Sequence, residues 1–296
     1  HIMSMEFDHT PESLTNLTIE LLRMDDYQQD IYIRPLAYKA EEGIGVRLHD
    51  LKEDLTIFAM PFGQYIKNDT NAHVTISSWR RIDDNMVPAR GKISGAYASS
   101  ALIKTDAARA GFDEALVLTQ EGHLTEGSAM NIFMVRDGSL VTPPVTDNIL
   151  EGITRRSVME LARNELGLTV IERPIDRSEV YICEELFLTG TAAQVTVATK
   201  VDYRPIGKGV IGPIGGQLRK LFLDVVRGNN PKYAHWNVAV ELDNKIERGS
   251  SAAFYFVIRT ISLRDRVFPG FYHGIIYKLQ LRSQLDWGSW SESGLV

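Results

Sequence analysis

Cysteine is almost absent from this sequence, which limits the ways in which the chain can be held together. The 296 residues include one cysteine, Cys183, so no disulfide can form within the chain, and a reducing cytoplasm is the expected compartment. No uninterrupted apolar run approaches the ~18 residues that a membrane-spanning helix needs, and no signal peptide is visible. A formal net charge of −6 argues against nucleic acid or an anionic membrane as the main partner. We therefore expect a soluble, cytoplasmic protein.

Several well-known site patterns are also absent. The sequence has no Cys/His spacing typical of a metal site, so no metal is expected. It has no Walker or Rossmann glycine pattern and no Gly-x-Ser-x-Gly nucleophile motif. Internal repeats are lacking as well. The function must therefore depend on a less common arrangement of residues.

The sequence does have the composition of an ordinary globular protein. It is 44% hydrophobic and 24% charged, and it is long enough for two compact domains. A capping threonine and leucines on one face predict an amphipathic helix over residues 10–24. Strands are predicted at 31–36 and 55–60, and a polar break at 67–72 is the expected domain linker.

Beyond this linker the patterns predict a strand-rich domain with three helices. One helix is rich in alanine, follows Lys92 and ends near Gly111, and the second begins near Glu151 and ends at Gly167. The third is predicted at 216–226. Strands are predicted at residues 73–79, 114–119, 131–135, 139–142, 170–174, 185–189, 195–201 and 203–206.

The candidate chemistry begins at Lys92, which lies among glycines in the stretch 91–97. A lone lysine is usually a solvated surface charge, but one flanked by small residues could enter a crowded pocket and react with an aldehyde. Two loops could bind an anion: one enters a helix through Gly152, although this loop by itself favours a plain capped helix, and the other spans 190–193. Arg34, in an apolar strand, fits either an edge position or an anion site.

A lysine, a carboxylate, a tyrosine and two anion-binding loops together are the groups that a pyridoxal phosphate (PLP) enzyme needs. Four segments, in order along the chain, resemble the branched-chain amino acid aminotransferases, which are class IV enzymes of PLP fold type IV. These segments are Arg90-Gly91-Lys92-Ile93-Ser94-Gly95-Ala96-Tyr97, Thr125-Glu126-Gly127-Ser128-Ala129-Met130-Asn131-Ile132-Phe133, Leu150-Glu151-Gly152-Ile153-Thr154-Arg155 and Leu188-Thr189-Gly190-Thr191-Ala192-Ala193.

The resemblance implies a mixed α+β or α/β fold with two domains, like that of D-amino acid aminotransferase, and a homodimer. It implies the cofactor pyridoxal 5'-phosphate and transfer of an amino group from leucine, isoleucine or valine to 2-oxoglutarate, with amino acids and 2-oxo acids as partners. Lys92 corresponds to the lysine that carries the cofactor as a Schiff base. Glu126 corresponds to the partner of the pyridine nitrogen, and Tyr97 to the donor to the phenolic oxygen.

The remaining site residues are also expected from the resemblance. Leu150 would pack on the cofactor ring, and Gly152, Ile153 and Thr154 would bind its phosphate together with Thr191.

A substrate site is implied in the same way. Tyr32 and Arg34, with Thr191 and Ala192, lie where the family holds the carboxylates of its substrates.

Two differences from the family shape the expected domains. The family begins with a further stretch of its small domain, so residues 4–66 are expected to be a truncated small domain, followed by the linker at 67–72 and a PLP-binding domain at 73–240. Residues 241–296 match nothing in the family. A D-amino acid aminotransferase, an aminodeoxychorismate lyase and an inactive fragment of the same fold remain alternatives.

Overall fold

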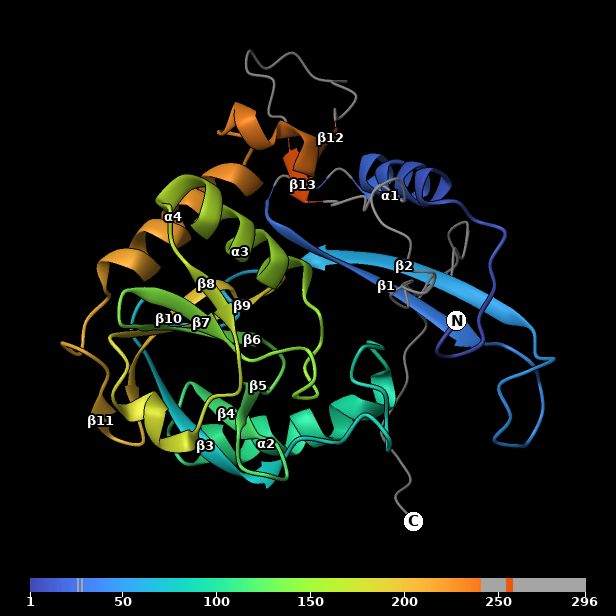
Figure 1. Cartoon of the computed structure of the whole chain (residues 1–296). Helices are drawn as coiled ribbons and strands as arrows, with labels where there is room; N and C mark the ends of the chain where they lie inside the picture. The colour runs from blue at the N-terminus through green and yellow to red at the C-terminus, as the bar shows by residue number, and fades with distance from the viewer. Residues whose placement is uncertain (26, 28, 241–253, 258–296) are drawn as a thin grey trace, which may run out of the picture.

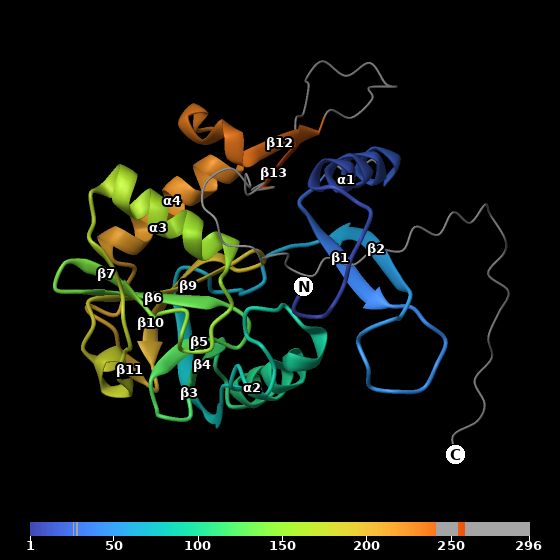
Figure 2. The same ribbon diagram turned by 45° about the vertical axis from the view of Figure 1, so that its right-hand side comes forward.

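The structure is a computed structural model that describes residues 1–25, 27 and 29–240, together with the backbone of 254–257. Within these residues a two-stranded antiparallel ribbon carries one helix, and a nine-stranded sheet carries three (Figure 1 and Figure 2). No helix in this part of the chain has the length and apolar character that crossing a membrane requires.

The ribbon is formed by β1 (Ile31–Lys39) and β2 (Glu53–Pro61), and α1 (Pro11–Asp25) lies beside it in both views (Figure 1 and Figure 2). The helix begins where predicted because the Oγ1 of Thr10 accepts the backbone N–H of Ser13 at 3.1 Å. Both strands extend beyond their predicted ends.

The nine-stranded sheet has the order β5-β4-β3-β10-β9-β6-β7-β8, with β11 paired to β10. Its mixed topology includes parallel pairs between β3 and β4, β3 and β10, and β7 and β8. The strands are β3 (Ala72–Arg80), β4 (Glu114–Leu118), β5 (Leu124–Gly127), β6 (Asn131–Arg136), β7 (Ser139–Thr142), β8 (Val170–Glu172), β9 (Glu185–Gly190), β10 (Gln194–Val201) and β11 (Arg204–Pro205).

Alternating side chains of the strands point into two different cores. In β6, Phe133 and Val135 join the core beneath α3 and α4, whereas Ile132 and Met134 join a second core. The second core also contains Leu116 of β4, so residues from distant parts of the sheet order meet inside it. The sheet therefore curls and encloses apolar side chains between its two halves.

The three helices cover the outer surfaces of this curled sheet. The first, α2 (Tyr97–Arg109), packs on β3 and β4 through Ile103 and Ala107. Helices α3 (Ile153–Leu166) and α4 (Pro213–Val226) lie together on the β9–β10 side (Figure 1). The short 3₁₀ segments η1 (Ser94–Ala96), η2 (Arg177–Tyr181) and η3 (Pro231–Trp236) complete the described helical structure.

The helix boundaries follow from local chemistry. Helix α3 ends, as predicted, at Gly167, whose φ of 62° is in the left-handed region that glycine adopts without strain. Helix α4 begins at Pro213, three residues before the predicted start, because proline suits the first turn of a helix. The buried carboxylate of Glu185 caps α4 by accepting the backbone N–H groups of Ile214 at 3.0 Å and Gly215 at 2.6 Å.

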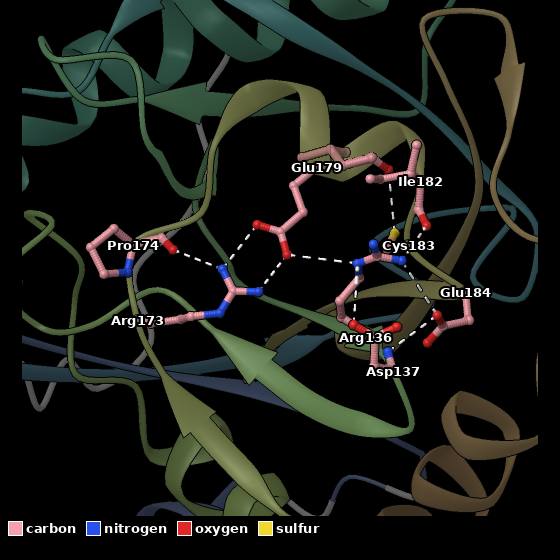
Figure 3. A network of polar contacts seen from close by, with 9 residues as sticks. Arg136, Asp137, Arg173, Pro174, Glu179, Ile182, Cys183 and Glu184 are labelled. Atoms are coloured by element: carbon pink, nitrogen blue, oxygen red, sulfur yellow. Dashed lines mark hydrogen bonds and ion pairs between the residues drawn. The ribbon is translucent and has the colours of Figure 1, made fainter.

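A polar network closes the corner between the β6–β7 hairpin and η2 (Figure 3). Arg173 pairs with Glu179 through both guanidinium nitrogens, one at 2.9 Å, and Arg136 donates to the carbonyl of Ile182 at 3.2 Å. Beside this network lies Cys183, which is buried, and burial raises the pKa of its thiol to about 12.

Most of the predicted tail, residues 241–296, lies outside the described residues. The exception is β13 (Phe254–Val257), which pairs antiparallel with β12 (Asn237–Val240). The expected linker at 67–72 overlaps the sheet by one residue, because Ala72 already begins β3.

Candidate active site

Lys92 lies in the segment that joins β3 to α2, immediately before η1. Its side chain is exposed, and its Nζ donates a hydrogen bond to the hydroxyl of Tyr97 at 2.7 Å. The same Nζ lies 5.0 Å from the centroid of the Tyr97 ring. Tyr97 is the first residue of α2, so the helix holds the phenol beside the amine.

The glycines around Lys92 do not enclose it as tightly as expected from the sequence. A Cβ on Gly91 would approach the Cγ1 of Ile93 to 3.0 Å, but a Cβ on Gly95 would have no neighbour within 4 Å. Within the protein itself, close packing against this stretch therefore occurs at Gly91 and not at Gly95.

Glu126 supplies a carboxylate from β5, and it is buried, with 4% of the residue exposed. Its Oε1 lies 3.0 Å from the Nη2 of Arg81, and its Oε2 accepts the backbone N–H of Leu150 at 3.1 Å. Burial raises the pKa of Glu126 above its ordinary value, while the charge of Arg81, the N–H of Leu150 and the charge of Lys92 act in the opposite direction. The carboxylate is thus within electrostatic reach of the lysine.

Asn131 connects Glu126 to the loop that enters α3. Its Nδ2 donates to the carbonyl of Leu150 at 2.8 Å and lies 3.4 Å from the Oε2 of Glu126. A Cβ on Gly152 would lie 2.1 Å from the Oδ1 of Asn131, so only glycine fits there without a shift. The φ of Gly152 is −62°, so space, and not backbone conformation, requires glycine.

The N-terminus of α3 is open, in contrast to that of α4. Gly152 is its N-cap, and a glycine has no side chain that could cap the first turn. The first-turn N–H groups and the positive end of the helix dipole can therefore interact with an anion. Thr154, in this first turn, is buried, and Ile153 is exposed.

The second predicted anion loop lies close to the first through the β6–β9 ladder. Thr189 of β9 is the direct partner of Asn131, and the turn containing Thr191 and Ala192 follows one residue later. Thr191 is exposed and Ala192 is half-buried. The Oγ1 of Thr189 is buried without a hydrogen-bond partner among the described residues.

The predicted substrate residues Tyr32 and Arg34 lie on the β1–β2 ribbon. The Nη2 of Arg34 donates to the hydroxyl of Tyr32 at 3.3 Å, and its guanidinium carbon lies 4.9 Å from the centroid of the Tyr32 ring. The ring of Tyr32 contacts Phe62 at 5.1 Å between centroids, and Phe62 stacks on Tyr65 at 6.4 Å.

Tyr65 is the link between this ribbon and the lysine region. Burial raises its pKa, and the neighbouring Glu114, Tyr32 and Tyr97 act in the same direction. Tyr65 is therefore close to a predicted substrate residue and to the partner of Lys92.

The structure thus brings Lys92, Tyr97 and Glu126 into one region. It joins Leu150, Gly152 and the Thr191 turn to that region through Asn131, and it connects Tyr32 and Arg34 to it through Phe62 and Tyr65.

Three residues with central contacts were not identified from the sequence: Arg81, Asn131 and Tyr65. Asn131 lies in the segment 125–133 that resembles the family, but the sequence does not indicate which residues its side chain contacts. Arg81 follows Arg80 directly, and nothing in the pair indicates which arginine turns inward. No group of three or more potential metal ligands occurs within the described part of the chain.

Known proteins with related sequences and structures give this geometry a context. The family model described as amino-transferase class IV matches residues 1–201. A probable branched-chain-amino-acid aminotransferase of Aquifex aeolicus is 44% identical over 232 residues, which are 78% of this chain and 75% of that protein. The branched-chain-amino-acid aminotransferase of Pseudomonas aeruginosa is 38% identical over 244 residues, 81% of this chain and 78% of that protein.

A solved structure agrees with these relatives. The branched-chain amino acid aminotransferase of Thermobaculum terrenum in its PLP form superimposes with a TM-score of 0.74 at 39% identity, covering 78% of this chain and 76% of that one. The chain therefore belongs to the class IV aminotransferase family, in its branched-chain-amino-acid aminotransferase group.

Proposed function

We propose that this chain uses pyridoxal 5'-phosphate to transfer the amino group of leucine, isoleucine or valine to 2-oxoglutarate. The observation that carries the proposal is the meeting of the Lys92 amine, the Tyr97 hydroxyl and the buried Glu126 carboxylate in one region. The relatives named above support the reaction and the substrate class. None of them is a D-amino acid aminotransferase or a lyase, so those alternatives are not favoured.

The residues present fit this cofactor. Its phosphate matches the open N-terminus of α3, where Gly152 leaves space that a Cβ would fill against Asn131. Its ring nitrogen matches the buried acid Glu126, and its aldehyde matches the amine of Lys92. When bound, the cofactor supplies an aldehyde that takes up the amino group and a ring that accepts electrons from the substrate carbon.

The reacting groups of the protein then have distinct tasks. With the cofactor bound, Lys92 would be the residue that holds its aldehyde carbon, and its amine would be the base that moves a proton at the substrate α-carbon. The Tyr97 hydroxyl, which accepts from Lys92 in this structure, would donate to the phenolic oxygen of the cofactor. Glu126 holds the ring nitrogen.

The remaining site residues orient the ligands. Leu150 would pack on the ring, while Ile153, Thr154 and Thr191 would donate to the phosphate. In a ping-pong exchange the amino acid and the 2-oxo acid use the same site in turn. We assign the binding of their carboxylates to Arg34 and Tyr32, together with Thr191 and Ala192 in the turn between β9 and β10.

We further propose that the chain forms a homodimer in the cytoplasm. The face of the β1–β2 ribbon that carries Arg34 also exposes Leu36, Phe58 and Met60, and Phe58 lies directly opposite Arg34 in the ladder. An exposed apolar group of this kind is typical of an interaction surface. Light scattering at several protein concentrations tests this proposal, and a monomer at every concentration would contradict it.

The test of the activity is a spectrum recorded after pyridoxal 5'-phosphate is added. The unmodified protein should show a visible absorbance band, and Lys92→Ala should lose it. Lys208→Ala, which also removes an exposed lysine, should keep it. A protein without the band at saturating cofactor would be an inactive member of the fold.

A panel of L- and D-amino acids then identifies the substrate class through the loss of that band. L-leucine, L-isoleucine and L-valine should react, and their D-enantiomers should not. The three substrates differ by one or two methyl groups, worth about 1–3 kcal/mol each, so their order must be measured. Preference for a D-amino acid would refute the branched-chain assignment.

A further inference from the structure

Arg81 occupies a position that the activity above leaves without a role. It directly follows β3, and its backbone is fixed at the end of β4: its N–H donates to the carbonyl of Leu118 at 2.9 Å, and its carbonyl accepts from the Nε2 of Gln120 at 3.1 Å. The side chain is largely enclosed, with 13% exposed. A rigid backbone and little exposure keep the guanidinium in one place.

The guanidinium joins two parts of the candidate site. Its Nη2 lies 3.0 Å from the Oε1 of Glu126, and its Nε donates to the carbonyl of Asn148 at 2.8 Å. Asn148 belongs to the loop that leads to Leu150, whose N–H binds the other oxygen of Glu126. Arg81 therefore orients the carboxylate and supports the loop behind it.

The charge of Arg81 matters because Glu126 is buried. Burial disfavours the ionised carboxylate and raises its pKa, and the two charged groups that oppose this are Arg81 and Lys92. Lys92 loses its ammonium charge when its nitrogen binds an aldehyde. Arg81 is then the remaining permanent positive charge beside Glu126, since a guanidinium stays protonated in proteins.

We propose that Arg81 is a positioning residue that keeps the Glu126 carboxylate ionised, so that the proton shared with the ring nitrogen of pyridoxal 5'-phosphate stays on the ring. This inference rests on the proposed role of Glu126. Without Arg81 the carboxylate becomes the stronger base and takes that proton. The ring is then neutral and a weaker acceptor of electrons.

The test uses the full chain loaded with pyridoxal 5'-phosphate that carries ¹⁵N in its ring, and it reads the nitrogen chemical shift by NMR. This shift reports whether the ring nitrogen carries a proton and does not depend on turnover. The variants are Arg81→Gln, Arg81→Lys, Glu126→Gln and the double variant of Arg81→Gln with Glu126→Gln. Arg219→Gln is the matched control, because it breaks an arginine–carboxylate pair, Arg219–Asp69 at 2.5 Å, that joins α4 to the segment before β3.

The unmodified protein and Arg219→Gln should show a protonated ring. Arg81→Gln should show an unprotonated ring and bind the cofactor about 10- to 100-fold more weakly, as expected for a lost hydrogen bond to a charged group. Arg81→Lys should restore much of the protonated signal because it restores the charge. In the double variant, the nitrogen chemical shift should be close to that of Glu126→Gln alone, because the carboxylate on which Arg81 acts is absent.

The outcomes separate the two proposals. If Glu126→Gln leaves the ring protonated, the proposed role of Glu126 fails. If Glu126→Gln removes the proton but Arg81→Gln matches the control, only the role of Arg81 is overturned.

A second variant covers the case in which Arg81→Gln does not fold. Arg81→His can be charged near pH 5.5 and neutral near pH 8, given the ordinary histidine pKa of about 6.5. Its ring signal should change from protonated to unprotonated between these values while that of the unmodified protein stays constant. An unchanged signal would overturn the proposal.

Discussion

At the scale of single residues, the site depends on short contacts between residues that are distant in sequence. The Lys92–Tyr97 bond lies within one segment, but the Glu126–Arg81 pair and the Asn131–Leu150 bond join separate elements. Each contact has one clear physical function, so each can be tested by removing a single group.

The hydroxyl of Tyr97 is the first such group. Tyr97→Phe removes the acceptor 2.7 Å from the Lys92 amine and should lower kcat/KM for L-leucine about 10- to 100-fold, because a hydrogen bond to a charged group is worth about 1.5–3 kcal/mol. Steady-state kinetics measure the effect. Tyr203→Phe, at an exposed tyrosine, is the control and should leave the rate unchanged. Equal rates for the two variants would remove Tyr97 from the site.

The second test at this scale adds a group, at Gly152, where the lack of a side chain leaves room for Asn131. Gly152→Ala places a Cβ 2.1 Å from the Asn131 amide oxygen, so the loop or Asn131 must shift. We expect a loss of about 1–3 kcal/mol in unfolding free energy and weaker binding of pyridoxal 5'-phosphate, measured by urea denaturation and fluorescence titration. Gly63→Ala, which meets nothing within 4 Å, should change neither quantity. Full cofactor affinity in Gly152→Ala would show that this loop does not hold the phosphate.

At the scale of secondary-structure elements, the two helices on the β9–β10 side of the sheet, α3 and α4, differ at their N-termini. Glu185 of β9 caps α4 with two backbone hydrogen bonds, whereas α3 has Gly152 and no side-chain cap among the described residues. The protein thus supplies its own anion at α4 and leaves α3 free for a ligand. The difference explains why only one of these helices is a phosphate candidate.

The cap on α4 makes a separate prediction. Glu185→Ala leaves the N–H groups of the half-buried Ile214 and the buried Gly215 without their acceptor, at a cost of about 1–3 kcal/mol for the buried group. The urea midpoint should fall clearly, and the spectrum of the bound cofactor should not change. Glu184→Ala, at the exposed neighbour, should stay within about 0.5 kcal/mol of the unmodified protein. Similar midpoints in the two variants would mean that the cap contributes little.

The elements themselves were largely predictable because they depend on local patterns. Gly167 and an apolar stripe predicted α3, and a capping threonine predicted the start of α1. The order of the strands was not predictable, since periodicity does not indicate which strands pair. For the same reason the contact of Arg81 with Glu126, across 45 positions of sequence, was invisible.

At the scale of the whole molecule, Cys183 reports whether the fold is intact. It lies in the core enclosed by the curled sheet, 2% exposed, and burial raises its pKa from 9.0 to about 12. The native protein should therefore resist thiol reagents at pH 8 and react fully in denaturant. Rapid labelling of the native protein would contradict the enclosed position.

The same thiol predicts how stability changes in alkali. A raised pKa means that the folded state retains a proton that the unfolded state loses, so stability is complete below pH 9 and decreases as the pH rises toward about 12. Urea titrations at several pH values measure this slope. Cys183→Ala should reduce it, whereas an identical slope would assign the effect to other groups.

The position of β9 and β10 in the sheet has a consequence for how the molecule assembles. These strands come late in the described chain, yet they lie at the centre, between β3 and β6. Until they are synthesised, β3–β4–β5 and β6–β7–β8 are two separate pieces with unpaired inner edges. Lys92, Arg81 and Glu126 belong to the first piece, and Asn131 and Gly152 belong to the second, with Gly152 in the segment between β7 and β8. The nascent chain therefore has all of these residues before it has a site, and β9 and β10, which follow both pieces in the chain, complete the centre of the sheet that holds the two pieces together.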